Sequence, residues 1–181
     1  SFPKRRCYDL KELKRILQAS KSKDMILFVG MPWMHKGKLY NVAAVLNRGR
    51  ILGIVPKKHL PNYSEFYELR HFNPGMEKVE MTDWEGVQVP MGMNLLFACR
   101  TMPELVLAAE LCEDVWVPCP PSISHALAGA TVIANCSASD ETTGKDQYRY
   151  NLICGQSARL VCGYIYANAG EGESTTDLVF G

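Results

Sequence analysis

Residues 105–118 read LVLAAELCEDVWVP, an apolar run that ends at Cys112 and is followed at once by two acidic residues, a tryptophan and a proline. The apolar run is typical of a buried strand. A cysteine placed where such a strand turns sharply projects its sulfur beyond the edge of the sheet, and backbone N–H groups close by can stabilise an oxyanion. The alternative is an ordinary core cysteine, which is how most cysteines are used. The segment therefore predicts a buried strand that ends in a candidate nucleophile.

On both sides of this segment, short apolar runs bounded by turn residues predict further strands. Gly30 and Pro32 are expected to end the first strand, and the turn at residues 47–50 is expected to join the second and third into a hairpin. A polar and aromatic loop should follow from residue 56 to residue 74. The predicted strands cover residues 25–29, 39–46, 51–55, 87–89, 94–99, 105–111, 131–135 and 161–167.

Helical periodicity predicts three helices between these strands. The first should begin at Asp9, where Glu12 completes a capping box, and should end before residue 24. A second is expected at residues 122–128, with the serine at its start as the cap, and a third at residues 148–160. Strands that alternate with helices indicate a layered α/β domain, and the sequence contains no repeat or linker that would divide it.

The composition excludes several classes of protein. The chain has 181 residues, 20 of them basic and 19 acidic, so its net charge of +1 is too small for a dedicated nucleic-acid binder. No apolar run is long enough to span a membrane, and the first residues do not resemble a signal peptide. Its seven scattered cysteines suit a reducing compartment, and its four histidines lack zinc-ligand spacing. These features predict a cytoplasmic protein without a structural metal and without nucleic-acid or membrane partners.

A thiolate at Cys112 would need a cation nearby, because the two carboxylates that follow it disfavour a second negative charge. The segment VPKKHLPNY at residues 55–63 supplies a candidate, since Lys57 directly follows a buried strand and can lie at the rim of the same cleft. The alternative is a solvated Lys-Lys pair. Glu65 and Glu68 follow among aromatic residues, which suggests a partly desolvated pocket, although surface positions are the usual ones for glutamate.

Two further segments contain polar residues that can bind a ligand. Residues 136–145, CSASDETTGK, combine hydroxyl groups with one cation, as a site for a zwitterionic amino acid requires; the alternative is a flexible surface loop. Residues 170–175, GEGEST, lack the third glycine, the Gly-Lys-Ser/Thr sequence and the following helix of a phosphate-binding loop. No nucleotide site is therefore predicted there.

Taken together, these segments resemble the nitrilase superfamily of carbon–nitrogen hydrolases and, within it, the glutaminase domains of bacterial glutamine-dependent NAD synthetases. The resemblance extends over nearly the whole chain from about Met25. It is carried, in the same order as in that family, by LYNVAAVLNRGRILGIVPKKHLPNYSEFYELRHF (39–72), ELCEDVWVPCPPS (110–122), NCSASDETTGKDQYR (135–149), QSARL (156–160) and YIYANAGEGESTTDLVF (164–180).

The resemblance implies a nitrilase-type αββα sandwich and assigns roles to particular residues. Cys112 is then the nucleophile, and Lys57, not Lys58, is the lysine of a Glu-Lys-Cys triad. Glu65 lies where the superfamily often has a second glutamate that positions the substrate amide. The resemblance also assigns five residues to the glutamine pocket: Tyr63, Glu113, Trp116, Ser139 and Lys145.

The resemblance further implies a reaction and its partners. The thiolate attacks the side-chain amide carbon of L-glutamine, ammonia leaves, and water hydrolyses the glutamyl thioester. The ammonia would pass to a synthetase domain outside this chain, which uses ATP and magnesium to convert nicotinic acid adenine dinucleotide to NAD. Within residues 1–181, a partial glutamine amidotransferase domain, no cofactor or metal is expected. Because family members assemble through this domain, a homo-oligomer is expected.

The triad's general-base glutamate has no match in the chain. Before Lys57 the only glutamate is Glu12, in a lysine-rich helix, and Glu104 in the phrase MPEL lies too late in the sequence. The domain is therefore expected to be incomplete, without the strand that carries the base and without its last strands. Since a positioned general base contributes about 10²–10⁴-fold, the chain alone is expected to be almost inactive.

Two other functions remain open at this point. One is a stand-alone amidase or carbamoylase of the same superfamily that acts on a different amide. The other is a non-catalytic, truncated copy that serves as an assembly surface, for which the missing glutamate is the main argument. The phrases SASDETTGK (137–145) and GESTTDLVF (172–180) favour the synthetase glutaminase over the amidase, and the presence of Cys112, Lys57, Tyr63, Ser139 and Lys145 argues against a non-catalytic copy.

Overall fold

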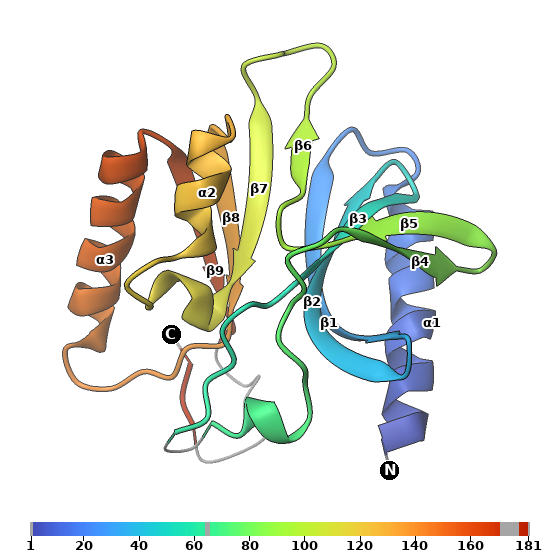
Figure 1. Cartoon of the computed structure of the whole chain (residues 1–181), viewed down its shortest axis with the longest axis horizontal. Helices are drawn as coiled ribbons and strands as arrows, with labels where there is room; N and C mark the ends of the chain where they lie inside the picture. The colour runs from blue at the N-terminus through green and yellow to red at the C-terminus, as the bar shows by residue number, and fades with distance from the viewer. Residues whose placement is uncertain (1, 64–65, 171–177, 181) are drawn as a thin grey trace. The chain divides into compact units, whose positions relative to one another are not determined.

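The computed structural model describes residues 2–63, 66–170 and 178–180, with residues 2–9 described by their backbone alone. By its internal contacts the chain divides into two compact units, residues 1–95 and residues 96–181, called here the first and the second unit (Figure 1). Glu65 and most of the segment 170–175 lie outside the described residues. Within the described residues, no helix has the length and apolar composition needed to span a membrane.

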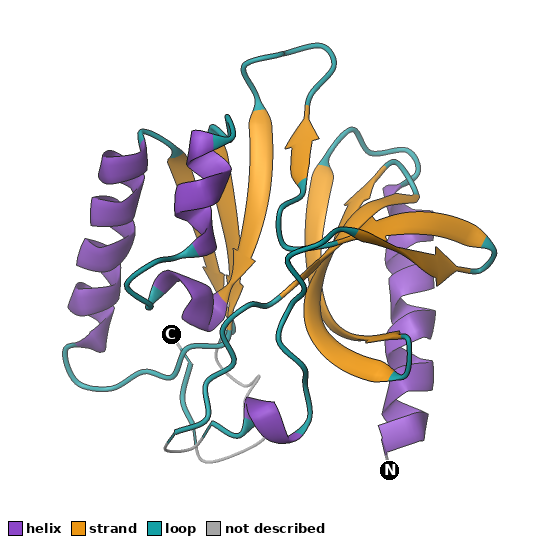
Figure 2. Cartoon of the chain, viewed as in Figure 1, coloured by secondary structure: helices purple, strands orange, loops and turns teal. Residues whose placement is uncertain are grey.

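The first unit packs one helix on a five-stranded sheet (Figure 2). The sheet order is β1-β2-β3-β5-β4, with β3 and β5 parallel and the other neighbours antiparallel. A short 3-10 helix, Glu68–Arg70, lies in the long loop after β3. The elements are α1 (Phe2–Ser20), β1 (Ile26–His35), β2 (Lys38–Asn47), β3 (Arg50–Pro56), β4 (Glu80–Trp84) and β5 (Val87–Met91).

Helix α1 confirms the predicted apolar face but not the predicted start. Leu13 and Leu17 are buried in the same core as Met31 and Val42 of the sheet, while the basic side chains from Lys11 to Arg15 are exposed. This is the pattern of an amphipathic surface helix. The helix begins at Phe2, so Asp9 lies within it and the prediction that Asp9 caps it is wrong. A capping box inside a longer helical segment cannot be recognised as internal from local spacing alone.

Strand β1 also differs from its prediction, because it continues through Gly30 and Pro32 to His35. β1 is an edge strand. Proline lacks a backbone N–H, and in an edge strand this costs no hydrogen bond of the sheet when the proline nitrogen faces away from the neighbouring strand. The β2–β3 hairpin confirms its prediction. Arg48 and Gly49 have φ values of 46° and 76°, the left-handed conformations of a two-residue type I′ turn.

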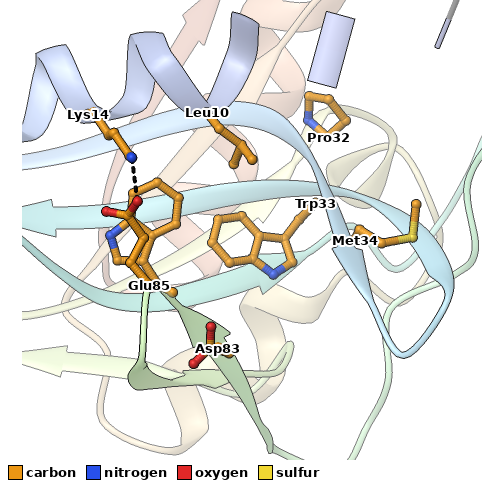
Figure 3. Close-up of a pocket in the computed structure, with 8 residues that line it drawn as sticks. Leu10, Lys14, Pro32, Trp33, Met34, Asp83 and Glu85 are labelled. Carbon is orange, nitrogen blue, oxygen red and sulfur yellow. Dashed lines mark ion pairs between the residues drawn. The ribbon is translucent and has the colours of Figure 1, made fainter. Parts of the chain in front are cut away.

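The two edges of this sheet are joined by side chains. Trp33 of β1 donates from Nε1 to Thr82 Oγ1 of β4 at 3.0 Å, and its ring lies 5.7 Å from that of Trp84. β4 was not predicted, because its sequence EMTDW lacks an apolar run. Beside the two tryptophans, α1, β1 and the β4–β5 turn border a cleft of about 190 Å³, which the Lys14–Glu85 ion pair crosses (Figure 3).

The contact between strands β1 and β4 should make the first unit sensitive to acid. Hydrogen bonds from Lys36 and His35, each 2.8 Å long, lower the pKa of Glu80 from 4.5 to about 2. Ionised Glu80 therefore stabilises the fold above pH 4.5, and this contribution is lost as the pH falls toward about 2. We expect Glu80→Gln to lose less thermal stability over this pH range than the parent chain, while Glu104→Gln should behave as the parent. Identical slopes for parent and Glu80→Gln would contradict the assignment.

The second unit packs two helices on one four-stranded sheet, of order β6-β7-β8-β9. β6 and β7 are antiparallel, whereas β7, β8 and β9 are parallel, and α2 and α3 lie side by side against this sheet in Figure 1. Both units thus confirm the predicted α/β class. The elements are β6 (Leu96–Ala98), β7 (Val106–Leu111), α2 (Pro121–Leu127), β8 (Val132–Ser137), α3 (Lys145–Leu160) and β9 (Gly163–Asn168).

The two helix starts of this unit differ from the predictions. α2 begins at Pro121 and not at Ser122, and proline is well suited to the first helical position because its missing N–H would have no partner there. Ser122 is therefore the second residue of the helix, so the predicted serine cap is wrong, and its N–H donates to the carboxylate of Glu110 at 2.8 Å. α3 begins at Lys145, three residues earlier than predicted, directly after Gly144 in the left-handed conformation.

Candidate functional site

Cys112 lies on a strained turn at the end of β7. Its φ is 46°, in a left-handed region that few residues other than glycine occupy, and the residue starts a 3-10 helix, Cys112–Val115. Two hydrogen bonds hold the turn: Cys112 N–H donates to Asn135 Oδ1 at 3.0 Å, and Leu111 N–H donates to Asp114 Oδ2 at 3.0 Å. The sharp turn predicted from the sequence is confirmed. The N–H of the cysteine itself is occupied by Asn135, so an oxyanion would need a different donor.

The carboxyl ends of three parallel strands meet around this turn. The pairing of Leu111 with Cys136 and of Ser137 with Asn168 aligns the ends of β7, β8 and β9 at one edge of the sheet. This edge is where open α/β sheets usually bind ligands. Asn168 fixes the loop after β8 by accepting the Ser139 N–H at 2.8 Å and donating to the Ser139 carbonyl at 3.0 Å. Ser139 is 4% exposed, so this part of segment 136–145 is not a flexible surface loop.

Lys145, Trp116 and Tyr148 form a stack beside this edge. Lys145 Nζ lies 5.6 Å from the centre of the Trp116 ring, which itself stacks on Tyr148 at 5.6 Å. The Lys145 ammonium is also paired with the carboxylate of Asp140. Two of the predicted pocket residues, Trp116 and Lys145, are therefore brought together, and Glu113 lies half-buried in the same 3-10 helix as Cys112.

Tyr166 of β9 is a neighbour of Cys112 that the sequence analysis missed. Burial raises the pKa of Tyr166, and the nearby Cys112 adds to the rise. The phenol is therefore neutral at physiological pH. Its place at the carboxyl end of a predicted strand was the one signal in the sequence that could have identified it.

Lys57 occupies a buried position in the first unit. It directly follows β3 and is only 1% exposed, whereas Lys58 is partly exposed. Its N–H donates to the Asn41 carbonyl and its own carbonyl accepts the Gly75 N–H, both at 2.8 Å. The ammonium donates to Glu68 Oε2 at 2.7 Å. The alternative of a solvated Lys-Lys pair is thus wrong for Lys57.

The sequence analysis suggested a partly desolvated pocket around Glu68 but gave this residue no role. It accepts the Lys57 ammonium through one oxygen and Asn41 Nδ2 through the other, at 3.1 Å. A buried ammonium needs such a counter-charge, so the burial of Lys57 is the signal that points to it. Glu65, the predicted second glutamate, lies outside the described residues and stays a prediction. Tyr63 is 56% exposed, with its ring against Phe66.

The glutamate that precedes Lys57 in the sequence, Glu12, does not contribute to either group of site residues. Glu12 is exposed on α1 and pairs with Arg15 at 2.7 Å. The structure thus joins Lys57 to Glu68 in the first unit, and groups Cys112 with Asn135 and Tyr166 in the second. The approach of the Lys57 ammonium to the Cys112 sulfur stays a prediction.

Comparisons with known proteins identify the family and the fold of the chain. The profile of the carbon-nitrogen hydrolase family matches residues 3–171. The glutamine-dependent NAD(+) synthetase of Mycobacterium tuberculosis is 49% identical over 155 residues, which are 86% of this chain but 23% of that protein. Among solved structures, the glutamine-dependent NAD(+) synthetase of Cytophaga hutchinsonii has a TM-score of 0.78 and 27% identity, over 91% of this chain and 26% of that one.

A more distant structure, Saccharomyces cerevisiae Nit3 of the nitrilase superfamily, has a TM-score of 0.66 at 17% identity, over 93% of this chain and 54% of that one, and so shows the fold alone. The chain therefore has the predicted nitrilase-type fold, and it spans about a quarter of the length of the synthetases that it matches. On the match of residues 3–171, this chain belongs to the carbon–nitrogen hydrolase family.

Proposed function

We propose that this chain is the glutaminase part of a glutamine-dependent NAD synthetase. The observation that carries the proposal is the left-handed turn at Cys112, which presents a cysteine at the edge where three parallel strands end. The similarity to synthetases of that name supports the same function. The reaction converts glutamine and water into glutamate and ammonia.

In this mechanism the Cys112 thiolate attacks the side-chain amide carbon of glutamine, and the carbonyl oxygen becomes an oxyanion. The Lys57 ammonium and a backbone N–H that follows the cysteine stabilise that charge. Collapse of the intermediate breaks the carbon–nitrogen bond, and the nitrogen leaves as ammonia after it takes up the proton that the Cys112 thiol lost on ionising. Water then cleaves the glutamyl thioester and restores the thiol. Glu68 orients the Lys57 ammonium through their hydrogen bond, and Glu65 is proposed to position the amide.

The amino-acid end of glutamine requires complementary charges. The Lys145 ammonium and the Ser139 hydroxyl suit its α-carboxylate, and the Glu113 carboxylate suits its α-ammonium group. Trp116 and Tyr63 supply flat surfaces for the methylene chain. Because Asp140 already pairs with Lys145, the lysine is held in place before glutamine binds.

The wider context is part of the same proposal. The ammonia would be used by a synthetase domain that activates nicotinic acid adenine dinucleotide with ATP and magnesium. The protein would act in the cytoplasm as a homo-oligomer, without nucleic-acid or membrane partners. The competing functions, an amidase or carbamoylase and a non-catalytic copy, predict different substrates or no turnover.

Substrate comparison tests the proposal. Ammonia release from L-glutamine, L-asparagine and an N-carbamoyl amino acid would be measured with the natural protein that carries this sequence. We expect glutamine to be preferred over asparagine by about 10–200-fold in kcat/KM, the usual value of one methylene group in a fitted pocket. A preference for the carbamoyl substrate would indicate the amidase, and no release from any substrate would indicate the non-catalytic copy.

A further inference from the structure

A buried carboxylate behind the Cys112 turn has no role in the mechanism above. Glu110 of β7 is 1% exposed, and burial raises the pKa of this group. It accepts hydrogen bonds at both oxygens, from Ser122 N–H to Oε2 at 2.8 Å and from the Tyr164 hydroxyl to Oε1. A buried carboxylate is costly, so its presence two residues before the candidate nucleophile calls for a function.

The hydrogen bonds continue from Glu110 to the backbone of Cys112. The Tyr164 oxygen, which donates to Glu110, accepts a hydrogen from Asn135 Nδ2 at 3.2 Å. The carbonyl oxygen of the same Asn135 side chain accepts Cys112 N–H at 3.0 Å. It also accepts the hydroxyl of Ser137 at 2.7 Å. The chain of bonds thus crosses from β7 to β9 and returns through β8 to the turn.

The direction of every bond in this chain follows from its first member. The Tyr164 hydroxyl donates its one hydrogen to Glu110 Oε1, so its lone pairs face Asn135. The amide of Asn135 must therefore point its NH₂ group at Tyr164 and its oxygen at Cys112. If that amide turned over, its NH₂ group would face the Cys112 N–H, and two donors would oppose each other. The left-handed turn would then lose a bond that offsets its strain.

We propose that Glu110 is a positioning residue that acts through Tyr164 to fix the side-chain amide of Asn135, which in turn holds Cys112 in its left-handed turn. The significance of this role for catalysis rests on Cys112 being the nucleophile. The placement of the Cys112 thiol by Glu110 can be tested without turnover of any substrate.

Alkylation of Cys112 tests the proposal. The initial rate with iodoacetamide would be followed by peptide mass spectrometry, which separates Cys112 from the other cysteines. We expect Glu110→Gln, Tyr164→Phe and Asn135→Ala each to slow alkylation by about 3–10-fold, the effect of losing one buried hydrogen bond. Ser157→Ala is the control, because it removes a 2.7 Å bond to the Cys162 carbonyl at the end of α3. It should lower the melting temperature without changing the rate at Cys112.

The decisive measurement is the double variant Glu110→Gln/Asn135→Ala. If Glu110 acts through Asn135, the second substitution adds nothing and the double variant alkylates at the rate of Asn135→Ala. Effects that multiply, or a parental rate in both Glu110→Gln and Tyr164→Phe, would overturn the proposal. Should Glu110→Gln not fold, Tyr164→Phe/Asn135→Ala gives the same comparison with only a hydroxyl removed from the buried chain. Failure of glutamine hydrolysis would instead refute the proposed function and leave these rates unaffected.

Discussion

Replacement of Cys112 by alanine is expected to abolish glutamine-dependent ammonia release in the natural protein, with a loss of about 10⁴–10⁶-fold in kcat. The reason is that no other group can form the glutamyl thioester, and the remaining oxyanion donors supply only residual catalysis. The measurement is ammonia production from glutamine, together with NAD formation when free ammonium replaces glutamine. NAD formation from ammonium should persist, because that reaction does not use the thiol.

The matched control for this variant is Cys119→Ala, which removes an exposed thiol seven residues later. We expect it to change glutamine hydrolysis by less than about twofold, as for most surface substitutions. A Cys112→Ala protein that retained a tenth or more of the parental glutamine activity would show that the nucleophile had been misassigned.

The second large effect concerns the Lys57–Glu68 pair. Glu68→Gln leaves the buried ammonium without its counter-charge and should lower the free energy of unfolding by about 2–4 kcal/mol, at or below the range for fully buried pairs because Glu68 is 22% exposed. Lys57→Met should reduce kcat/KM for glutamine by about 10²–10³-fold, the usual cost of one oxyanion donor. Denaturant unfolding and ammonia release measure the two effects separately.

The double variant Lys57→Met/Glu68→Gln separates stability from catalysis. Replacement of both members of a buried pair by neutral groups is often neutral for stability, so the double variant should unfold nearly as the parent does. Its glutamine activity should nevertheless stay as low as that of Lys57→Met. Lys58→Met, at the partly exposed neighbouring lysine, should change neither quantity. Recovery of activity in the double variant would mean that Lys57 is structural and not catalytic.

Much of the local structure could be predicted because it depends on neighbouring residues. The strand that ends at Cys112, the β2–β3 hairpin and the apolar face of α1 all follow from patterns within a few positions. The errors arose where context from elsewhere in the chain decides. Pro32 is tolerated because β1 lies at an edge, and Ser122 is not a cap because α2 already begins at Pro121 and the Ser122 hydroxyl accepts a hydrogen bond from Gln156.

The candidate site divides in the same way. The residue types of Cys112, Lys57 and Lys145 were visible in the sequence, and so were the places of Cys112 and Lys57 directly after predicted strands; the place of Lys145 at the start of α3 was not. Only the tertiary structure decided their partners, which are Asn135 for Cys112, Glu68 for Lys57 and Asp140 for Lys145. A hydrogen bond depends on strand order, register and loop path, and these are set by packing of the whole unit. Sequence by itself therefore determined which groups can do chemistry, and the folded chain decided what each of them contacts.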